Sequence, residues 1–468
     1  MHSENSSLKL IDYSSSEDLS IKVAAISLGC AKNRIDTEEI LGLLSLKGYV
    51  LTDDFQIADI VLVNTCGFID QAQQESIDTL LKVVASKSEQ AKFVVAAGCL
   101  VELHGGKLLT NIPEIDGVIG VHSYKHLERF MAMIRSGKKV VIKNTPPEKY
   151  CSLAPRILTR PVHSANVKIA EGCSNRCHYC LIPKIRGHYR SRQPEDILTE
   201  VKNLLLNGTR EINLIAQDTT AYGSDDDKYP DLAGLIKEIL SIDKKFWLRI
   251  MYTYPSRVTD VLIETLASDK RVCNYLDIPI QHSNDKILQL MARHYNRESL
   301  IDLMTRMRKK IPDLAMRTTC MVGYPGENRS QYDDLLNFIT TNPVEHMGAF
   351  AYSCQKGTVA GNSTRQVPHR VVRQRLNRLM KNQRQISTQL NQKYVGKWLT
   401  VLVEKRFLRN SNWYYGRTQY QAPEVDGGVY FKSTFVLKPG DWVTARIDAA
   451  SPYNLLAVHS RPLAELPD

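Results

Sequence analysis

The sequence predicts an α/β protein with three folded units: an N-terminal parallel α/β sandwich, a central partial barrel of six βα units, and a small C-terminal antiparallel β barrel. Three observations support this prediction. Short apolar runs alternate with helical patterns over residues 21–125, the alternation resumes at Val167, and after Lys397 the pattern changes to short strands and turns. A chain of 468 residues is long enough for two to four domains of about 100–200 residues each.

The first unit is expected over residues 21–138. Apolar runs at 23–29, 59–64, 92–98 and 117–121 each precede a helical pattern. Apolar strands that alternate with helices are typical of a parallel sheet covered on both faces. Residues 1–20 are polar and lack the apolar segment of a signal peptide, so they predict a disordered tail. Residues 139–163 contain several prolines and no periodicity, which predicts a linker.

The central unit is expected over residues 164–394. Its strand candidates are 167–172, 211–218, 246–254, 275–280, 315–323 and 348–353. Six βα units are fewer than the eight of a closed barrel, so we expect an open, partial barrel. Residues 365–394 end this unit with eight Lys or Arg residues, no Asp or Glu, and apolar positions at helical spacing. This pattern indicates a basic amphipathic helix.

The third unit is expected over residues 395–462. Four β-rich runs are separated by Asn, Gly, Pro and Asp, which is typical of a small antiparallel barrel of about 65 residues. The segment has nine Lys or Arg residues against five Asp or Glu. That excess is modest for a module whose only task is to bind RNA.

The composition limits the compartment and the partners. No apolar run approaches the ~20 residues of a membrane helix, so the sequence predicts no membrane association and a cytoplasmic location. Ten cysteines in that reducing compartment indicate metal ligands or buried thiols rather than disulfides. The net charge of +11 fits an anionic partner such as nucleic acid, and equally a basic enzyme without one.

Three cysteines lie close together in the stretch GCSNRCHYC. Cys173, Cys177 and Cys180 follow the first strand of the central unit, at the edge where barrel active sites form. Three thiolates on a 4Fe–4S cluster leave one iron free to bind another ligand. The alternative is a zinc site of three cysteines and His178.

A second cysteine triplet is spread along the N-terminal unit. Cys30, Cys66 and Cys99 each follow an apolar run. Parallel strands bring their carboxyl ends to one edge of the sheet, so we expect the three thiols to converge there. A single buried cysteine is more often a core residue, but three at equivalent positions indicate a second cluster with an open iron.

The first triplet and its barrel resemble the radical S-adenosylmethionine superfamily. That resemblance implies a 4Fe–4S cluster on Cys173, Cys177 and Cys180, whose open iron binds S-adenosylmethionine. Reductive cleavage of that cofactor then yields a 5′-deoxyadenosyl radical. Tyr179 matches an aromatic position near the adenine in that superfamily, although it could simply pack the loop.

From about residue 21 to 462, the chain resembles the methylthiotransferase family. The matching blocks are SLGCAKNRIDTE (27–38), VNTCGFID (63–70), AAGC (96–99), EGCSNRCHYCLIPKIRG (171–187) and VGYPGE (322–327), and the last unit is similar to the TRAM module. The family differs in having Pro more often at Ala31 and an apolar residue at Cys320. The resemblance implies two 4Fe–4S clusters, with the one on Cys30, Cys66 and Cys99 supplying sulfur, and S-adenosylmethionine as radical source and methyl donor.

The family contains modifiers of tRNA adenosine and a branch that modifies an aspartate of small-subunit ribosomal protein twelve. Three stretches favour the second branch: AQDTTAYG (216–223), LDIPIQHSNDKIL (276–288) and GRTQYQAPEVDGGVY (416–430). In the last, we expect Glu424 and Asp426 to disfavour RNA phosphates. The implied partners are that protein, free or in the ribosomal subunit, and an electron donor.

Two other functions remain open at this stage. A tRNA methylthiotransferase would share the chemistry and would use the basic helix, and a non-enzymatic iron–sulfur protein would bind the ribosome or RNA. Asp218 and Asp277 could contact S-adenosylmethionine or substrate, or could be structural. The remaining cysteines have no shared spacing and are expected to be structural thiols: Cys151, Cys273, Cys320 and Cys354.

Overall fold

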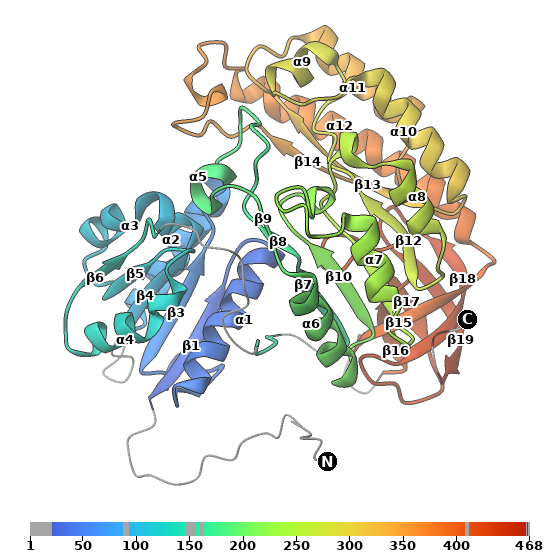
Figure 1. The fold of residues 1–468 in the computed structure, drawn as a ribbon. Coiled ribbons are helices and arrows are strands. Elements are labelled where there is room, and N and C mark those ends of the chain that lie inside the picture. The colour runs from blue at the N-terminus through green and yellow to red at the C-terminus, as the bar shows by residue number, and fades with distance from the viewer. Residues whose placement is uncertain are drawn as a thin grey trace.

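The computed structural model describes residues 21–87, 93–145, 156–159, 162–407, 411–464 and 466. The three units appear in Figure 1 as a blue sheet, a green-to-orange barrel and a red barrel. Within the described residues, no helix is long and apolar enough to cross a membrane. The predicted tail 1–20, residues 146–155 and 160–161 of the predicted linker, and Cys151 lie outside the described residues.

The N-terminal unit is a parallel α/β sandwich, as predicted. Its elements are β1 (Lys22–Ser27), α1 (Ala31–Leu46), β2 (Val50–Leu51), β3 (Ile60–Thr65), α2 (Asp70–Ala85), β4 (Phe93–Gly98), α3 (Cys99–Asn111), β5 (Gly117–Ile119), α4 (Leu127–Arg135) and β6 (Val140–Ile142). The strand order is β2-β1-β3-β4-β5-β6. Helices α1 and α4 cover one face, and α2 and α3 cover the other. The helices change face between β1 and β3, which is where open α/β sheets place ligands.

This sheet extends into the segment that was predicted to be a linker. Strand β6 pairs in parallel with β5 and adds a sixth strand at the edge. A three-residue run is too short to show periodicity, and the prolines that follow it dominate the local pattern. The sheet therefore passes the expected boundary at residue 138.

The central unit is an open barrel of six parallel strands. Its elements are β7 (Ser164–Lys168), β8 (Ala170–Glu171), α5 (Ile182–Arg186), β9 (Arg190–Ser191), α6 (Pro194–Leu206), β10 (Glu211–Ile215), α7 (Leu232–Leu240), β11 (Trp247–Ile250), α8 (Asp260–Ala267), β12 (Val272–Asp277), α9 (Asp285–Leu290), α10 (Arg297–Lys310), β13 (Ala315–Val322), α11 (Arg329–Thr341), β14 (His346–Ala351) and α12 (His369–Asn391). The six strands pair in chain order from β7 through β10 to β14, and β7 does not meet β14. The prediction of a partial barrel is confirmed.

The C-terminal unit is a closed five-stranded barrel. Its strands are β15 (Trp398–Arg406), β16 (Trp413–Arg417), β17 (Val429–Lys432), β18 (Trp442–Ala450) and β19 (Leu455–Leu463). The sequence indicated only four, because β19 carries Pro462 near its end and proline weakens a strand pattern. With five strands, alternating directions cannot close a ring, so one pair must be parallel. That pair is β17 and β19, and the other four pairs are antiparallel, so the predicted small antiparallel barrel is confirmed with one parallel pair.

A buried ionic contact joins this barrel to the central unit. Glu211, at the start of β10, accepts hydrogen bonds from Arg417 at 3.0 Å and from Arg249 at 3.0 Å, and all three side chains are buried. Burial opposes ionisation of Glu211, but Arg417 and Arg249 outweigh it and lower the pKa of the carboxyl to about 2. Beside them, the rings of Trp247 and Trp442 meet edge to face at 4.6 Å.

Replacing Glu211 should destabilise the protein. The Glu211→Gln variant removes the carboxylate that pairs with the buried Arg249 and leaves Arg417 with Glu404 alone, so we expect the free energy of unfolding to fall by about 3–5 kcal/mol in urea titrations at pH 7. The exposed pair of Glu264 and Lys310 provides the matched control, and Glu264→Gln should cost less than about 1 kcal/mol.

The pH dependence of stability provides a second readout of the same variant. Because the folded-state pKa of Glu211 lies below its unfolded value, its contribution is present above about pH 4.3 and is lost as the pH falls towards 2. The stabilities of wild type and Glu211→Gln should therefore converge on acidification. If Glu211→Gln lowers the free energy of unfolding at pH 7 by no more than Glu264→Gln does, the stabilising role of Glu211 is contradicted.

Candidate functional site

The first cysteine triplet occupies the loop between β8 and α5. Gly172 opens the loop at φ +78°, where a Cβ would lie 2.1 Å from the His188 carbonyl oxygen, so this position requires glycine. The backbone N–H of Cys180 donates to the Cys177 carbonyl, and that of Ile182 donates to Sγ of Cys180 at 3.4 Å. The loop thus holds its thiols by backbone bonds at the carboxyl edge of the barrel strands.

The second triplet lies at the carboxyl edge of the N-terminal sheet. Cys30 precedes α1, Cys66 follows β3, and Cys99 begins α3, so the three flank the adjacent strands β1, β3 and β4. Two glycines permit the close approach of their backbones. A Cβ on Gly29 would lie 2.7 Å from Cβ of Cys66, and one on Gly67 would lie 3.0 Å from the Cys99 carbonyl carbon. The structure therefore brings together the three cysteines that the sequence separates.

Burial makes the free thiolates of both triplets costly. It raises the pKa of Cys173 to about 11 and that of Cys99 to about 12, and neighbouring cysteines of the same triplet add to each shift. Cationic ligands reverse this preference because they bind the thiolate form. In the part of the chain that the structure describes, no three His, Cys, Asp or Glu side chains are close enough to bind a single metal ion.

A buried cluster of four charged side chains, which we call the interdomain ion cluster, joins the two triplets. Its members are Asp36 of α1, Lys168 of β7, Glu171 of β8 and Arg186 of α5. Lys168 Nζ lies 2.6 Å from Asp36 and 2.9 Å from Glu171, while Arg186 lies 2.7 Å from Asp36 and 3.0 Å from Glu171. Burial disfavours the Glu171 carboxylate, but Arg186 and Lys168 hold its pKa well below the usual range. Each carboxylate therefore pairs with both cations, and each cation pairs with one carboxylate from each domain.

Two arginines each donate to one cysteine of a triplet. Arg186 Nη2 lies 3.4 Å from Sγ of Cys99, and Arg293 Nη1 lies 3.5 Å from Sγ of Cys177. Arg186 thus connects the loop of one triplet directly to a thiol of the other. Sequence reasoning missed both residues, because the cysteines they contact lie 87 and 116 positions away in the sequence. The only signal was the position of Arg186 within the matching block 171–187.

The two arginines differ in the charge of their surroundings. Arg186 is neutralised within the interdomain ion cluster. Among the described residues, the oxygen atoms and rings that contact Arg293 are neutral: the Tyr295 hydroxyl at 2.6 Å, the Pro279 carbonyl at 2.8 Å, and the ring of Tyr254 at 4.2 Å. Arg293 therefore brings an uncompensated positive charge to the first triplet.

Asp218 proves to be a support for the first cysteine loop. Its carboxylate accepts from the Asn175 side chain at 2.8 Å and pairs with Arg257 at 2.6 Å, and Arg257 also donates to Asn175 at 3.0 Å. Asn175 lies between Cys173 and Cys177 in the loop. These bonds fix the loop between the first two thiols.

Asp277 is the last residue of β12 in the central unit. It accepts from the Tyr252 backbone N–H at 3.1 Å, while its other oxygen has no hydrogen bond, and burial raises its pKa to about 6. Tyr252 has φ +60°, a conformation that is rare outside glycine. The Lys32 ammonium lies 3.3 Å above the Tyr252 ring, so α1 reaches across to the barrel at this point.

The remaining predicted residues have structural partners. Tyr179 packs edge to face on Tyr324, with centroids 6.5 Å apart, and Nδ1 of His178 lies 2.9 Å from the Leu290 carbonyl oxygen. We expected the acidic pair of the last unit to disfavour RNA phosphates, and each member contacts another unit of the chain. Asp426 is buried and bonds Tyr275 at 2.8 Å, and Glu424 pairs with Arg34 of the N-terminal unit. Both carboxylates bind other units of this chain.

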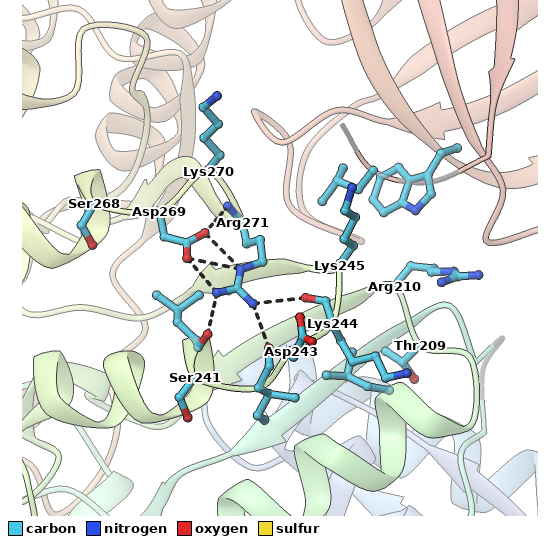
Figure 2. A pocket seen from close by; sticks show the side chains of 15 residues that line it. Thr209, Arg210, Ser241, Asp243, Lys244, Lys245, Ser268, Asp269, Lys270 and Arg271 are labelled. Atoms are coloured by element: carbon cyan, nitrogen blue, oxygen red, sulfur yellow. Dashed lines mark hydrogen bonds and ion pairs between the residues drawn. The ribbon is translucent and has the colours of Figure 1, made fainter. Parts of the chain in front are cut away.

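A cavity of about 800 Å³ lies at the opposite edge of the barrel, beside the segments that precede β10, β11 and β12. Figure 2 shows Arg271 among the side chains that line this cavity. The guanidinium donates to Asp269 and to the carbonyls of Leu240, Ile242 and Lys244. This arginine is fully used in joining the loops, and no cysteine lines the cavity. The cavity is therefore a structural feature remote from both triplets.

Comparison with known proteins adds independent information. Residues 167–339 match the Radical SAM superfamily, 22–120 match the Uncharacterized protein family UPF0004, and 395–459 match the TRAM domain. The chain is 40% identical over 438 residues to "Ribosomal protein uS12 methylthiotransferase RimO" of Pelotomaculum thermopropionicum, covering 93% of this chain and 99% of the relative. This chain belongs to the ribosomal protein uS12 methylthiotransferase family.

Further similarities agree with this membership. A protein of the same name from Clostridium acetobutylicum is 42% identical over 440 residues, which cover 94% of this chain and 98% of that one. The radical S-adenosylmethionine methyltransferase TsrM from Kitasatospora setae, solved with cobalamin and a 4Fe–4S cluster, has a TM-score of 0.55 at 14% identity. The match covers 73% of this chain and 77% of TsrM, and at that identity it supports the fold alone.

Proposed function

We propose that this protein adds a methylthio group to the β-carbon of an aspartate in uS12, small-subunit ribosomal protein twelve. The observation that carries the proposal is the 40% identity to a uS12 methylthiotransferase along almost the entire length of both chains. The two cysteine triplets, joined by the interdomain ion cluster, provide the chemistry that such a reaction needs. The free thiols of the chain fit a reducing compartment, and we infer that the reaction takes place in the cytoplasm.

The donor sets suit two 4Fe–4S clusters. Cys173, Cys177 and Cys180 would hold one, and Cys30, Cys66 and Cys99 would hold the other. Three thiolates on a cluster leave one iron for another ligand, and each thiolate binds a different iron, so the thiols need not converge on a single ion. When bound, the first cluster supplies the electron that cleaves S-adenosylmethionine to a radical, and the second supplies the sulfur.

The chain's own residues orient and shield these sites. Asp218, through Asn175, fixes the first cysteine loop, and Arg186 donates to Cys99 from that loop's far end. Cys99, Cys173 and the interdomain ion cluster are buried, which excludes water from these parts of the two sites. Such exclusion protects a reactive radical from side reactions. An external electron donor completes the system.

The tRNA alternative is not favoured. It rested on the basic helix, which tRNA and ribosomal RNA would attract equally through their phosphates. Relatives that match over almost the full length include uS12 methylthiotransferases. A non-enzymatic role is excluded by membership of a methylthiotransferase family with the cysteines of both triplets in place.

Removing either triplet should separate the two roles. We expect about eight irons per reconstituted wild-type chain, because two 4Fe–4S clusters carry about four each. Replacement of Cys173, Cys177 and Cys180 by Ala should halve the iron and abolish formation of 5′-deoxyadenosine. Replacement of Cys30, Cys66 and Cys99 should also halve the iron but leave reductive cleavage intact, without sulfur transfer. Four irons in the wild type at full occupancy would refute the two-cluster assignment.

The charge of Arg293 should tune the first cluster. A positive charge at this distance stabilises the reduced state, so Arg293→Gln should lower its midpoint potential. We expect a roughly tenfold lower ratio of reduced to oxidised cluster at a fixed potential, equivalent to about 59 mV for one electron. The measurement is an EPR redox titration in the background that lacks Cys30, Cys66 and Cys99. Arg293→Lys keeps the charge and should restore most of the potential; equal potentials in all three proteins would exclude this role.

The substrate can be tested in cells. In a strain that lacks the gene, peptide mapping of uS12 should show loss of the methylthio group from one aspartate. Nucleoside analysis of tRNA in the same strain should show methylthio-adenosine unchanged. The reverse pattern would assign the protein to tRNA.

A further inference from the structure

Helix α12 has two faces of opposite character. Its buried side chains include Val372, Leu379 and Ile386, which pack on the central unit with α11 and β14. Gln383, whose polarity interrupted the apolar pattern in the sequence, lies on this face and donates to the Val344 carbonyl at 2.8 Å. This face is therefore fully used by the fold.

The opposite face carries a basic stripe formed by Arg370, Arg373, Lys381 and Arg384. All four are exposed. At 100° per residue they fall within an arc of about 80° and span about 21 Å of helix. The 23-residue helix contains no Asp or Glu. In the described part of the chain, none of the four forms an ion pair, whereas Arg375 pairs with Glu327 and Arg378 with Asp333.

The basic stripe runs along the molecule from the catalytic edge to the C-terminal barrel. Near its start, Val372 packs against Gly323, which follows β13 at the edge that carries the first cysteine loop; a Cβ on Gly323 would lie 2.4 Å from Val372. At its end, Asn391 donates to the Ser451 carbonyl of the C-terminal barrel at 2.9 Å. The two ends of α12 thus lie at the edge that carries the first cysteine loop and at the C-terminal barrel (Figure 1).

We propose that the basic stripe docks on the phosphodiester backbone of RNA in the small ribosomal subunit. This proposal rests on the proposed function, since uS12 in the subunit is surrounded by RNA. Arginine forks bind phosphate oxygens in pairs, and the exposed amides of Gln374, Asn377 and Gln385 between the cations add neutral donors. The stripe has no apolar anchor of the kind that protein interfaces depend on, which favours RNA over an acidic protein.

The test compares two charge-matched variants. One carries Arg370→Gln, Arg373→Gln, Lys381→Gln and Arg384→Gln. The control removes four other exposed cations of the central unit, with Lys202→Gln, Lys237→Gln, Lys286→Gln and Lys309→Gln. Binding of the full-length proteins to small subunits, to protein-free small-subunit RNA and to isolated uS12 is measured between 50 and 200 mM salt, the range over which phosphate contacts lose affinity steeply.

We expect the stripe variant to reduce the slope of log K against log salt by about 3 for subunits and for RNA, because each phosphate contact contributes about 0.7–0.9. The control should change it by less than half as much. An unchanged slope in the stripe variant, or an equal loss of affinity for isolated uS12, would overturn the proposal; the second result would assign the stripe to protein docking. Because binding is measured, a failure of the methylthio reaction would not mimic either result.

A folding control keeps the test decisive. Thermal melts of both variants should match the wild type, since none of the eight side chains is buried. If the fourfold variant melts early, Arg373→Gln with Arg384→Gln should still lower the slope by about 1.5. No change in slope for this pair would equally overturn the proposal.

Discussion

The interdomain ion cluster determines how the two halves of the reaction centre meet. Four charges, Asp36, Lys168, Glu171 and Arg186, lie in the interface between the N-terminal sheet and the barrel and are all buried. Burying one charge alone is very costly, and only close pairing with opposite charges offsets the loss of water. Since Asp36 comes from one domain and its two cationic partners come from the other, the charges are satisfied only when the domains dock in this arrangement.

That arrangement brings the carboxyl edge of the N-terminal sheet next to the first cysteine loop. Arg186 belongs to both neighbourhoods, since it bonds Asp36 and Cys99 while it ends the helix that follows Cys180. The C-terminal barrel is joined to the central unit through Arg417 on Glu211 and through Asp426 on Arg317, and to the N-terminal unit through Glu424 on Arg34. The proposed reaction centre is thus built from two units, neither of which holds both triplets alone.

Local patterns predicted most of the fold and the cysteines. A cysteine after an apolar strand can be recognised from a few residues, and parallel topology then implies that such cysteines converge. The ionic contacts could not be predicted in this way, because Asp36 and Lys168 are 132 positions apart and Glu211 and Arg417 are 206 apart. For the same reason, the partners of Asp426 could not be predicted, because Tyr275 and Arg317 lie in the central unit.

The most direct measurement of whether the triplets share one reaction centre is EPR of the reconstituted protein with both clusters reduced. Two paramagnetic clusters held near each other by the interdomain ion cluster should couple magnetically. The spectrum should then be broader than the sum of the spectra from the two variants that each lack one triplet. A wild-type spectrum equal to that sum would mean that the clusters are magnetically isolated, and would contradict a single centre built across the interface.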